Sequence, residues 1–61
     1  MRDPQRIPKI LARLAHLWQQ HPQLRLAQLI GNVFHRERDP YHLEDESFIA
    51  ELEKYYSSRK V

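Results

Sequence analysis

Three stretches of this chain carry apolar residues at the spacing of one helix face, and this pattern constrains the fold more than any other feature. In the first stretch, these residues fall within about 120° of one another on a 3.6-residue wheel. The three sets are Ile7, Ile10, Leu11, Leu14, Leu17 and Trp18; Leu26, Leu29, Ile30, Val33 and Phe34; and Phe48, Ile49, Leu52, Tyr55 and Tyr56. We therefore predict an all-α fold, a small three-helix domain with an irregular connection between helices 2 and 3.

Prolines mark the expected ends of the first helix, which we place over residues 4–20. Asp3 is a favourable N-cap, and Pro4 then takes the first helical position, where a missing N–H costs nothing. Pro22 disfavours helical geometry at the residue before it, so the helix should end there. A start at Pro8 is the alternative, because a proline within a helix forfeits a backbone hydrogen bond and crowds the preceding turn.

The second helix is expected over residues 25–35 and the third over residues 45–57. Gly31 is the only glycine and lies inside the second helix, where glycine costs about 1 kcal/mol relative to alanine. It marks either a close approach between helices or a break in the helix. The acidic residues 44–46 suit the capping and the macrodipole of the third helix. A cation site is their other possible role, but they lack the glycine and the alternating ligands of a calcium loop.

The segment from His35 to Pro40 is polar and ends in a turn-favouring Asp-Pro pair. This composition predicts an exposed connection between helices. We expect the next three residues to be extended, with Tyr41 and Leu43 placed on the core. The run is too short to predict a strand.

For a chain of 61 residues, we expect a single helical domain over residues 1–61, of a size at which one hydrophobic core is barely sufficient. It has no cysteine, so neither a disulfide nor a thiolate-bound zinc ion reinforces the fold. A homo-oligomer or a protein partner is therefore expected to contribute to its stability. No stretch is apolar enough for a signal-peptide core or a membrane span, and we expect a cytoplasmic protein that does not bind membranes.

The net charge of +2 conceals an asymmetry along the chain. Residues 1–38 carry seven Arg or Lys against two acids, a balance of +5, and residues 39–61 carry six acids against three bases, a balance of −3. Two interpretations fit this distribution. Either the helices match one another electrostatically within the molecule, or a basic face is offered to an acidic partner.

Several of the apolar positions form a longer frame with Trp18, Pro22 and Gln28. The frame reads Ile7-x2-Ile10-Leu11-x2-Leu14-x3-Trp18-x3-Pro22-x-Leu24-x-Leu26-x-Gln28-x-Ile30, followed by Glu44-Asp45 at the opening of an apolar helix. Over about residues 7–56, the chain resembles the YihD-type family of small bacterial proteins of unknown function. The resemblance implies a bacterial, cytoplasmic, helical protein and carries over no catalytic residue.

Basic residues gather on one stripe of the first predicted helix, about 120° from its apolar stripe. The stripe comprises Arg6, Lys9, Arg13, His16 and Gln20. Such a stripe can follow the phosphates of a nucleic acid, because Lys and Arg contacts dominate that affinity. We favour the alternative, a solvated face that keeps the protein in solution, because a few basic residues on an exposed helix are common.

The outer side of the second predicted helix adds side chains that can read base edges. Gln and Asn pair with adenine and Arg with guanine, and the short link over residues 21–24 is similar to that of a helix-turn-helix. Gln28 could equally bond to the loop backbone, and no tight glycine turn separates the two helices. The nucleic-acid candidates are Arg6, Lys9, Arg13, Arg25, Gln28, Asn32 and Arg36.

The residues that enzymes use are present but not in catalytic arrangements. The four histidines, His16, His21, His35 and His42, lack the His-Glu-x-x-His spacing, and we expect exposed imidazoles and no metal site. No serine lies in a glycine-flanked nucleophile turn. We therefore predict that the protein is not an enzyme and has neither a cofactor nor a small-molecule substrate.

Three aromatic residues are the candidates for a protein interface. Trp18 is expected in the core, where it would close one end of the three-helix arrangement; as an exposed residue it would anchor an interface. For Tyr55 and Tyr56 the two roles are evenly balanced, because adjacent residues on a helix cannot both point at one core centre. Our leading hypothesis is a protein-interaction module that self-associates or binds another protein through these aromatics and an edge of the first helix; nucleic-acid binding is the alternative.

Overall fold

The computed structural model describes residues 3–35 and 38–58, which hold three α-helices, one short 3-10 helix and no strand. The elements are α1 (Arg6–Gln19), α2 (Leu26–Gly31), η1 (Pro40–His42) and α3 (Asp45–Ser58). The predicted all-α class, the three helices and the irregular connection between the second and third are confirmed. The prediction for the third helix is correct to within one residue.

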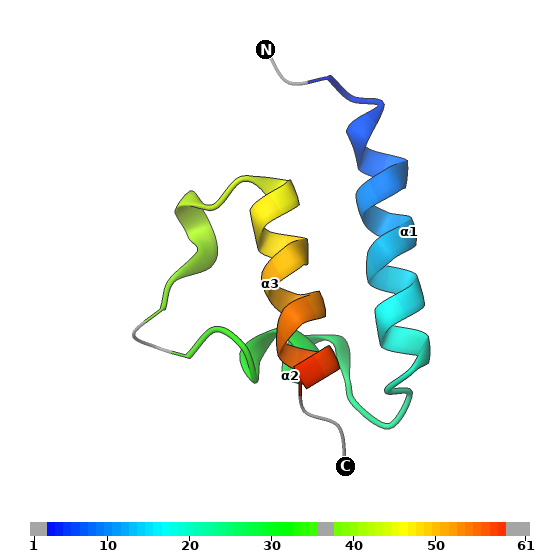
Figure 1. Cartoon of the computed structure of the whole chain (residues 1–61), viewed down its shortest axis with the longest axis vertical. Helices are drawn as coiled ribbons and strands as arrows, with labels where there is room; N and C mark the ends of the chain where they lie inside the picture. The colour runs from blue at the N-terminus through cyan, green and yellow to red at the C-terminus, as the bar shows by residue number, and fades with distance from the viewer. Residues whose placement is uncertain (1–2, 36–37, 59–61) are drawn as a thin grey trace.

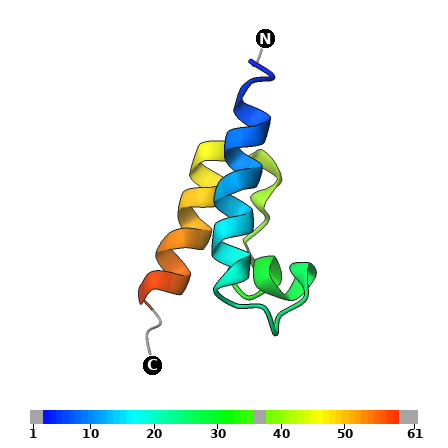
Figure 2. The same cartoon turned by 90° about the vertical axis from the view of Figure 1, so that its right-hand side faces the viewer.

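The two long helices, α1 and α3, lie side by side and run in the same direction (Figure 1, Figure 2). The segment that connects them must therefore lead from the C-terminal end of α1 back to the N-terminal end of α3 (Figure 1). It crosses through α2 at the C-terminal end of α1 and then rises through η1 on the side of α3 away from α1 (Figure 1). The result is an elongated molecule of 39 × 26 × 19 Å.

A small hydrophobic core lies where α2 meets the two long helices. The residues with the lowest exposure are Leu17 from α1, Leu29 from α2, Val33 and Phe34 just after α2, and Ile49 and Leu52 from α3. The rings of Phe34 and Phe48 stack against one another with their centroids 5.2 Å apart. The core thus contains residues of all three α-helices, and the buried residue of α1, Leu17, lies in its C-terminal half.

The start of α1 differs from the sequence prediction by two residues. Asp3 caps a turn before the helix, accepting a hydrogen bond from the Gln5 backbone N–H at 2.9 Å, and the helix then begins at Arg6. Pro8 is therefore the third helical residue. The N–H groups of a first turn have no partner within the helix, so a proline is tolerated there. The alternative start at Pro8 is wrong.

The second helix is shorter than predicted, because α2 ends at Gly31. A Cβ added to Gly31 would meet no atom within 4 Å, so a close approach between helices does not explain this glycine. The break in the helix, the other interpretation, matches its position. Beyond it, Val33 and Phe34 are buried outside the helix, and both of their N–H groups bond to the carbonyl of Ile30.

Residues 40–42 form a 3-10 helix and only Leu43 after them is extended, so the predicted extended segment is wrong for Tyr41 and His42. The expectation that Tyr41 and Leu43 lie on the core is also wrong. Pro40 opens η1, and the carboxylate of Asp39 caps it by accepting from the Tyr41 N–H at 3.0 Å. This capping and the fixed φ of a proline at the first position favour a helical turn. Tyr41 consequently points into solvent with 82% of its surface exposed, and Leu43 is 38% exposed.

Candidate protein-interaction surface

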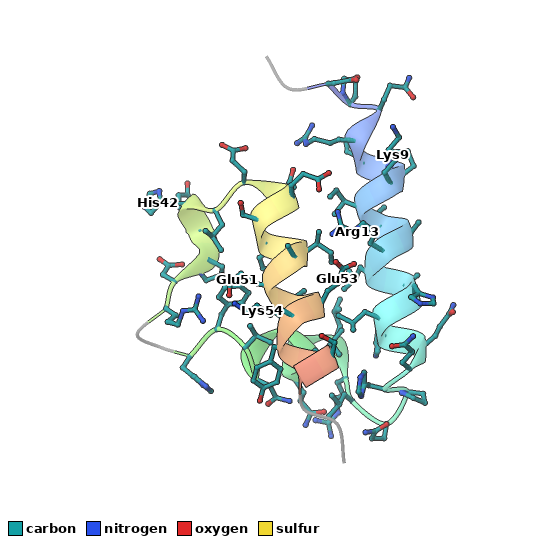
Figure 3. All side chains as sticks on the ribbon, viewed as in Figure 1. Lys9, Arg13, His42, Glu51, Glu53 and Lys54 are labelled. Atoms are coloured by element: carbon teal, nitrogen blue, oxygen red, sulfur yellow. The ribbon has the colours of Figure 1, made fainter. Side chains whose placement is uncertain are left out.

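Ion pairs join α1 to α3. Arg13 donates two hydrogen bonds to the carboxylate of Glu53, from Nη2 at 2.6 Å and from Nε at 3.0 Å, and a third from Nη1 to Glu46 at 2.7 Å. Arg6 donates from Nε to Asp45 at 2.7 Å. Figure 3 shows Arg13 and Glu53 pointing toward one another between the two helices. These pairs set the register of α1 against α3, and Asp45 and Glu46 also lie favourably in the first turn of α3, at the N-terminal end of its macrodipole.

The two-point contact between Arg13 and Glu53 shifts the pKa of both groups. Hydrogen bonding to Arg13 holds the pKa of the Glu53 carboxyl below its ordinary value, and the opposing effect of burial is smaller. Hydrogen bonds to Glu53 and Glu46 raise the pKa of the Arg13 guanidinium. Both members of the pair therefore stay charged at neutral pH.

These contacts give the charge asymmetry of the sequence an internal role. The basic first helix meets the acidic third helix, and Arg38 makes a further pair with Glu51 at 3.1 Å. Two of the nucleic-acid candidates, Arg6 and Arg13, are engaged in this way. Lys9 and Arg25 are exposed, and within the described part of the chain neither forms an ion pair.

The polar candidates on α2 also bond within the fold. Gln28 accepts a hydrogen bond from the Arg25 backbone N–H at 2.9 Å, so its side chain caps the helix that carries it, as the alternative interpretation held. Asn32 donates to the hydroxyl of Tyr56 at 3.4 Å. Arg36, the last of the nucleic-acid candidates, lies outside the described residues.

Both tyrosines of α3 pack on the core from half-buried positions. The hydroxyl of Tyr56 donates to the carbonyl of Leu29 at 2.6 Å, and its ring lies 4.7 Å from that of His21. The ring of Tyr55 meets that of Tyr56 edge-on at 4.9 Å. Tyr56 therefore supplies a hydrogen bond to a carbonyl near the end of α2, where backbone groups lack helical partners.

Trp18 is half-buried, and a hydrogen bond fixes its orientation. Its indole Nε1 donates to the carbonyl of Leu24 at 2.7 Å and so holds the link between α1 and α2 against the end of α1. The same side chain lines an open hollow of about 350 Å³, together with Ala15, Gln19 and Pro22. Trp18 is absent from the core and from the side chains packed against it, so the expectation that it closes one end of the core is wrong. Its side chain instead holds the link after α1 and borders an apolar surface.

Ile7 and Leu11 were predicted to belong to the core stripe of the first helix, and this prediction is wrong. Their surfaces are 49% and 55% exposed. The physical reason is the length of α2: at 1.5 Å per residue its six residues span about 9 Å, against about 21 Å for the fourteen of α1. α2 lies only at the C-terminal end of α1 (Figure 2). In the N-terminal half of α1, Ile10 still packs against the core, but no third helix covers Ile7 and Leu11.

The exposed apolar positions continue around one side of α1 with no charged residue among them. We call this set the uncharged face of α1: Ile7, Pro8, Leu11, Ala12, Ala15, Trp18 and Gln19. On a helical wheel these residues occupy a sector of about 140°, and Arg6, Lys9, Arg13 and His16 occupy a separate sector of about 80°. One helix therefore presents an apolar side and a basic side that do not mix.

The remaining surface offers less to a ligand. No group of three or more His, Asp or Glu side chains within the described residues is placed to hold a metal ion. In the same part of the chain, no helix is long and apolar enough to cross a membrane. The other hollows are lined by residues of the ion pairs, such as the one of about 230 Å³ beside Arg13 and Glu53.

Comparison with protein-family models, with curated proteins and with solved structures finds no match to this chain. The resemblance to the YihD-type family therefore stays a prediction.

Proposed function

We propose that this protein is a small helical protein-interaction module whose binding surface is the uncharged face of α1. The observation that carries this proposal is the exposure of Ile7 and Leu11 next to the hollow at Trp18. Contiguous apolar surface of this kind on a small protein marks a site of association. The fixed indole at one end of the face supplies the rigid aromatic anchor that interfaces favour.

The small core supports the same conclusion. Only six of the described hydrophobic residues are buried, and Leu17 is the only one of them on α1. A domain of this size gains little stability from one core, so burial of the uncharged face by a partner would add to it. The aromatic residues of α3, Tyr55 and Tyr56, support the fold from inside, and the proposed surface therefore involves Trp18 without them.

A comparative capture experiment tests this function. The tagged protein, its Leu11→Glu variant and the matched control Leu43→Glu are each used to capture proteins from extracts of the source cell. Both substitutions place a carboxylate at an exposed leucine, but only Leu11 lies on the proposed surface. We expect capture of a partner, whether an untagged copy of this chain or another protein, to be lost with Leu11→Glu and kept with Leu43→Glu. Equal capture by all three would contradict the proposal.

Nucleic-acid binding remains the second prediction, although fewer of its basic candidates are exposed and unpaired than the sequence suggested. Arg6 and Arg13 are engaged by carboxylates of α3, and the described residues leave Lys9 and Arg25 as the exposed basic candidates. This alternative requires binding to duplex or single-stranded probes at about 50 mM salt, falling steeply as salt rises. Absence of binding by both probes would remove it.

A further inference from the structure

We propose that the uncharged face of α1 binds a second copy of this chain, forming a two-fold dimer in which the two α1 helices pack antiparallel. Ile7 and Leu11 of each copy enter the hollow beside Trp18 of the other. The proposal rests on the protein-binding function above and specifies its partner.

The first argument is that α1 carries both halves of a self-complementary contact. Its projecting side chains, Ile7 and Leu11, lie toward the N-terminal end, and its hollow, lined by Ala15 and Trp18, lies toward the C-terminal end on the same side. In a two-fold interface, residue i of one copy meets residue j of the other, and j meets i. An axis near the middle of α1 thus brings the projections of each copy onto the hollow of its partner.

The register of this pairing follows from the positions along the helix. The two projecting residues are centred on position 9 and the hollow residues of α1 on about position 17, so the axis passes near position 13. The helix runs from Arg6 to Gln19, and its own centre lies at nearly the same place. The two helices therefore overlap along their whole length. In this register Leu11 of one copy packs on Ala15 of the other, a large side chain against a small one.

The second argument is electrostatic. The chain carries a net charge of +2, so two copies repel one another weakly wherever their basic groups face each other. The uncharged face is the side of α1 on which no basic group lies, because Arg6, Lys9 and Arg13 occupy the other sector of the wheel. Arg6 and Arg13 of that other sector are already paired with carboxylates of α3, which leaves Lys9 as its exposed cation. The uncharged face is therefore suited to an identical copy.

The area of the contact limits its strength. A helix face about 21 Å long and about 10 Å wide is smaller than the interfaces of stable complexes and falls among weak, transient contacts. We therefore expect a weak dimer that dissociates on dilution, with a dissociation constant in the micromolar to millimolar range.

Sedimentation equilibrium and tryptophan emission over a dilution series test the dimer. Trp18 is the only tryptophan and borders the hollow, so its emission should shift to the blue as the chain dimerises. We expect Leu11→Glu and Ala15→Lys each to raise the dissociation constant at least about tenfold, because each places a charge in the apolar contact. The control variants Leu43→Glu and Ala50→Lys, which alter exposed residues elsewhere, should dimerise as the unaltered chain does. Circular dichroism checks that every variant is folded.

Mixing the two weakened variants tests the antiparallel register. When Leu11→Glu and Ala15→Lys are combined in equal amounts, one Glu–Lys pair and one unaltered Leu–Ala contact form across the axis. We expect the mixture to dimerise more strongly than either variant alone. A parallel pairing brings position 11 to position 11, so its mixed dimer only loses the like-charge contacts and has no directly opposed Glu–Lys pair, and its recovery is smaller.

Three results would overturn the proposal: a chain that stays monomeric up to about 1 mM, a dimer unaffected by both substitutions, or a mixture without recovery. These results are separate from failure of the proposed function. A monomeric chain whose capture of a different protein still depends on Leu11 would keep the interaction module and remove the dimer.

Discussion

At the scale of single residues, the hydroxyl of Tyr56 and the guanidinium of Arg13 each link α3 to another helix. Tyr56 bonds to a carbonyl of α2, and Arg13 reaches two carboxylates of α3 from α1. The sequence indicated an electrostatic match between helices but not which residues would meet, because α1 and α3 pair only after the chain has returned through α2. The role of Tyr56 left no signal in the sequence, since a tyrosine on a helix can face a core or a partner equally well.

Replacement of Tyr56 by phenylalanine should destabilise the protein by about 1–2 kcal/mol, because the carbonyl of buried Leu29 loses its hydrogen bond. Chemical denaturation at fixed protein concentration measures this change. Tyr41→Phe is the matched control, as the Tyr41 side chain is 82% exposed, and it should leave the midpoint unchanged. Equal midpoints for Tyr56→Phe and the unaltered protein would show that this bond contributes nothing net.

The lowered pKa of Glu53 predicts a pH-dependent effect of Glu53→Gln. The carboxyl binds its proton less readily in the folded chain than in the unfolded chain, so its contribution is complete above its ordinary pKa of 4.5 and is lost as pH falls through the lower folded value. The unaltered protein should therefore melt a few degrees above the variant at neutral pH. The gap should shrink as the solution is acidified below about pH 4. A gap that stays constant over this range would contradict the assigned role of the ion pair.

At the scale of elements, the short α2 determines the character of the surface. Apolar spacing predicted all three helices, and it placed α3 correctly because acidic residues mark its start. The same spacing predicted too long a second helix, since Val33 and Phe34 continue the stripe although the helix ends at Gly31. Apolar spacing therefore identified Val33 and Phe34 as buried residues, but it did not show that their backbone lies outside the helix. The exposure of Ile7 and Leu11 follows from that missing helix length, which periodicity alone does not show.

Gly31→Ala should stabilise the protein by about 0.5–1 kcal/mol, because Gly31 has an ordinary helical position with open space where the methyl group would lie. Thermal unfolding measures the change as a rise in Tm. A fall in Tm would mean that the chain needs the conformational freedom of glycine at the end of α2.

At the scale of the whole molecule, a leucine in the core and a leucine on the uncharged face should contribute very differently to the stability of the monomer. Leu52 is fully buried, and Leu52→Ala should cost about 2–5 kcal/mol, enough to unfold much of so small a domain. Leu11 is 55% exposed, and Leu11→Ala should change the stability of the monomer by no more than about 0.5 kcal/mol. Denaturation at low protein concentration, where association is negligible, compares the two. If both variants lost the same free energy of unfolding, Leu11 would belong to the core and not to the uncharged face.

Amide NMR spectra recorded over a concentration series test most directly whether the uncharged face of α1 is the surface that associates. We expect resonances of Ile7, Leu11, Ala15 and the indole N–H of Trp18 to shift progressively as concentration rises, and those of exposed α3 residues such as Ala50 and Lys54 to stay in place. Shifts confined to α3, or to η1 and its neighbours, would contradict the assignment of the interface to α1.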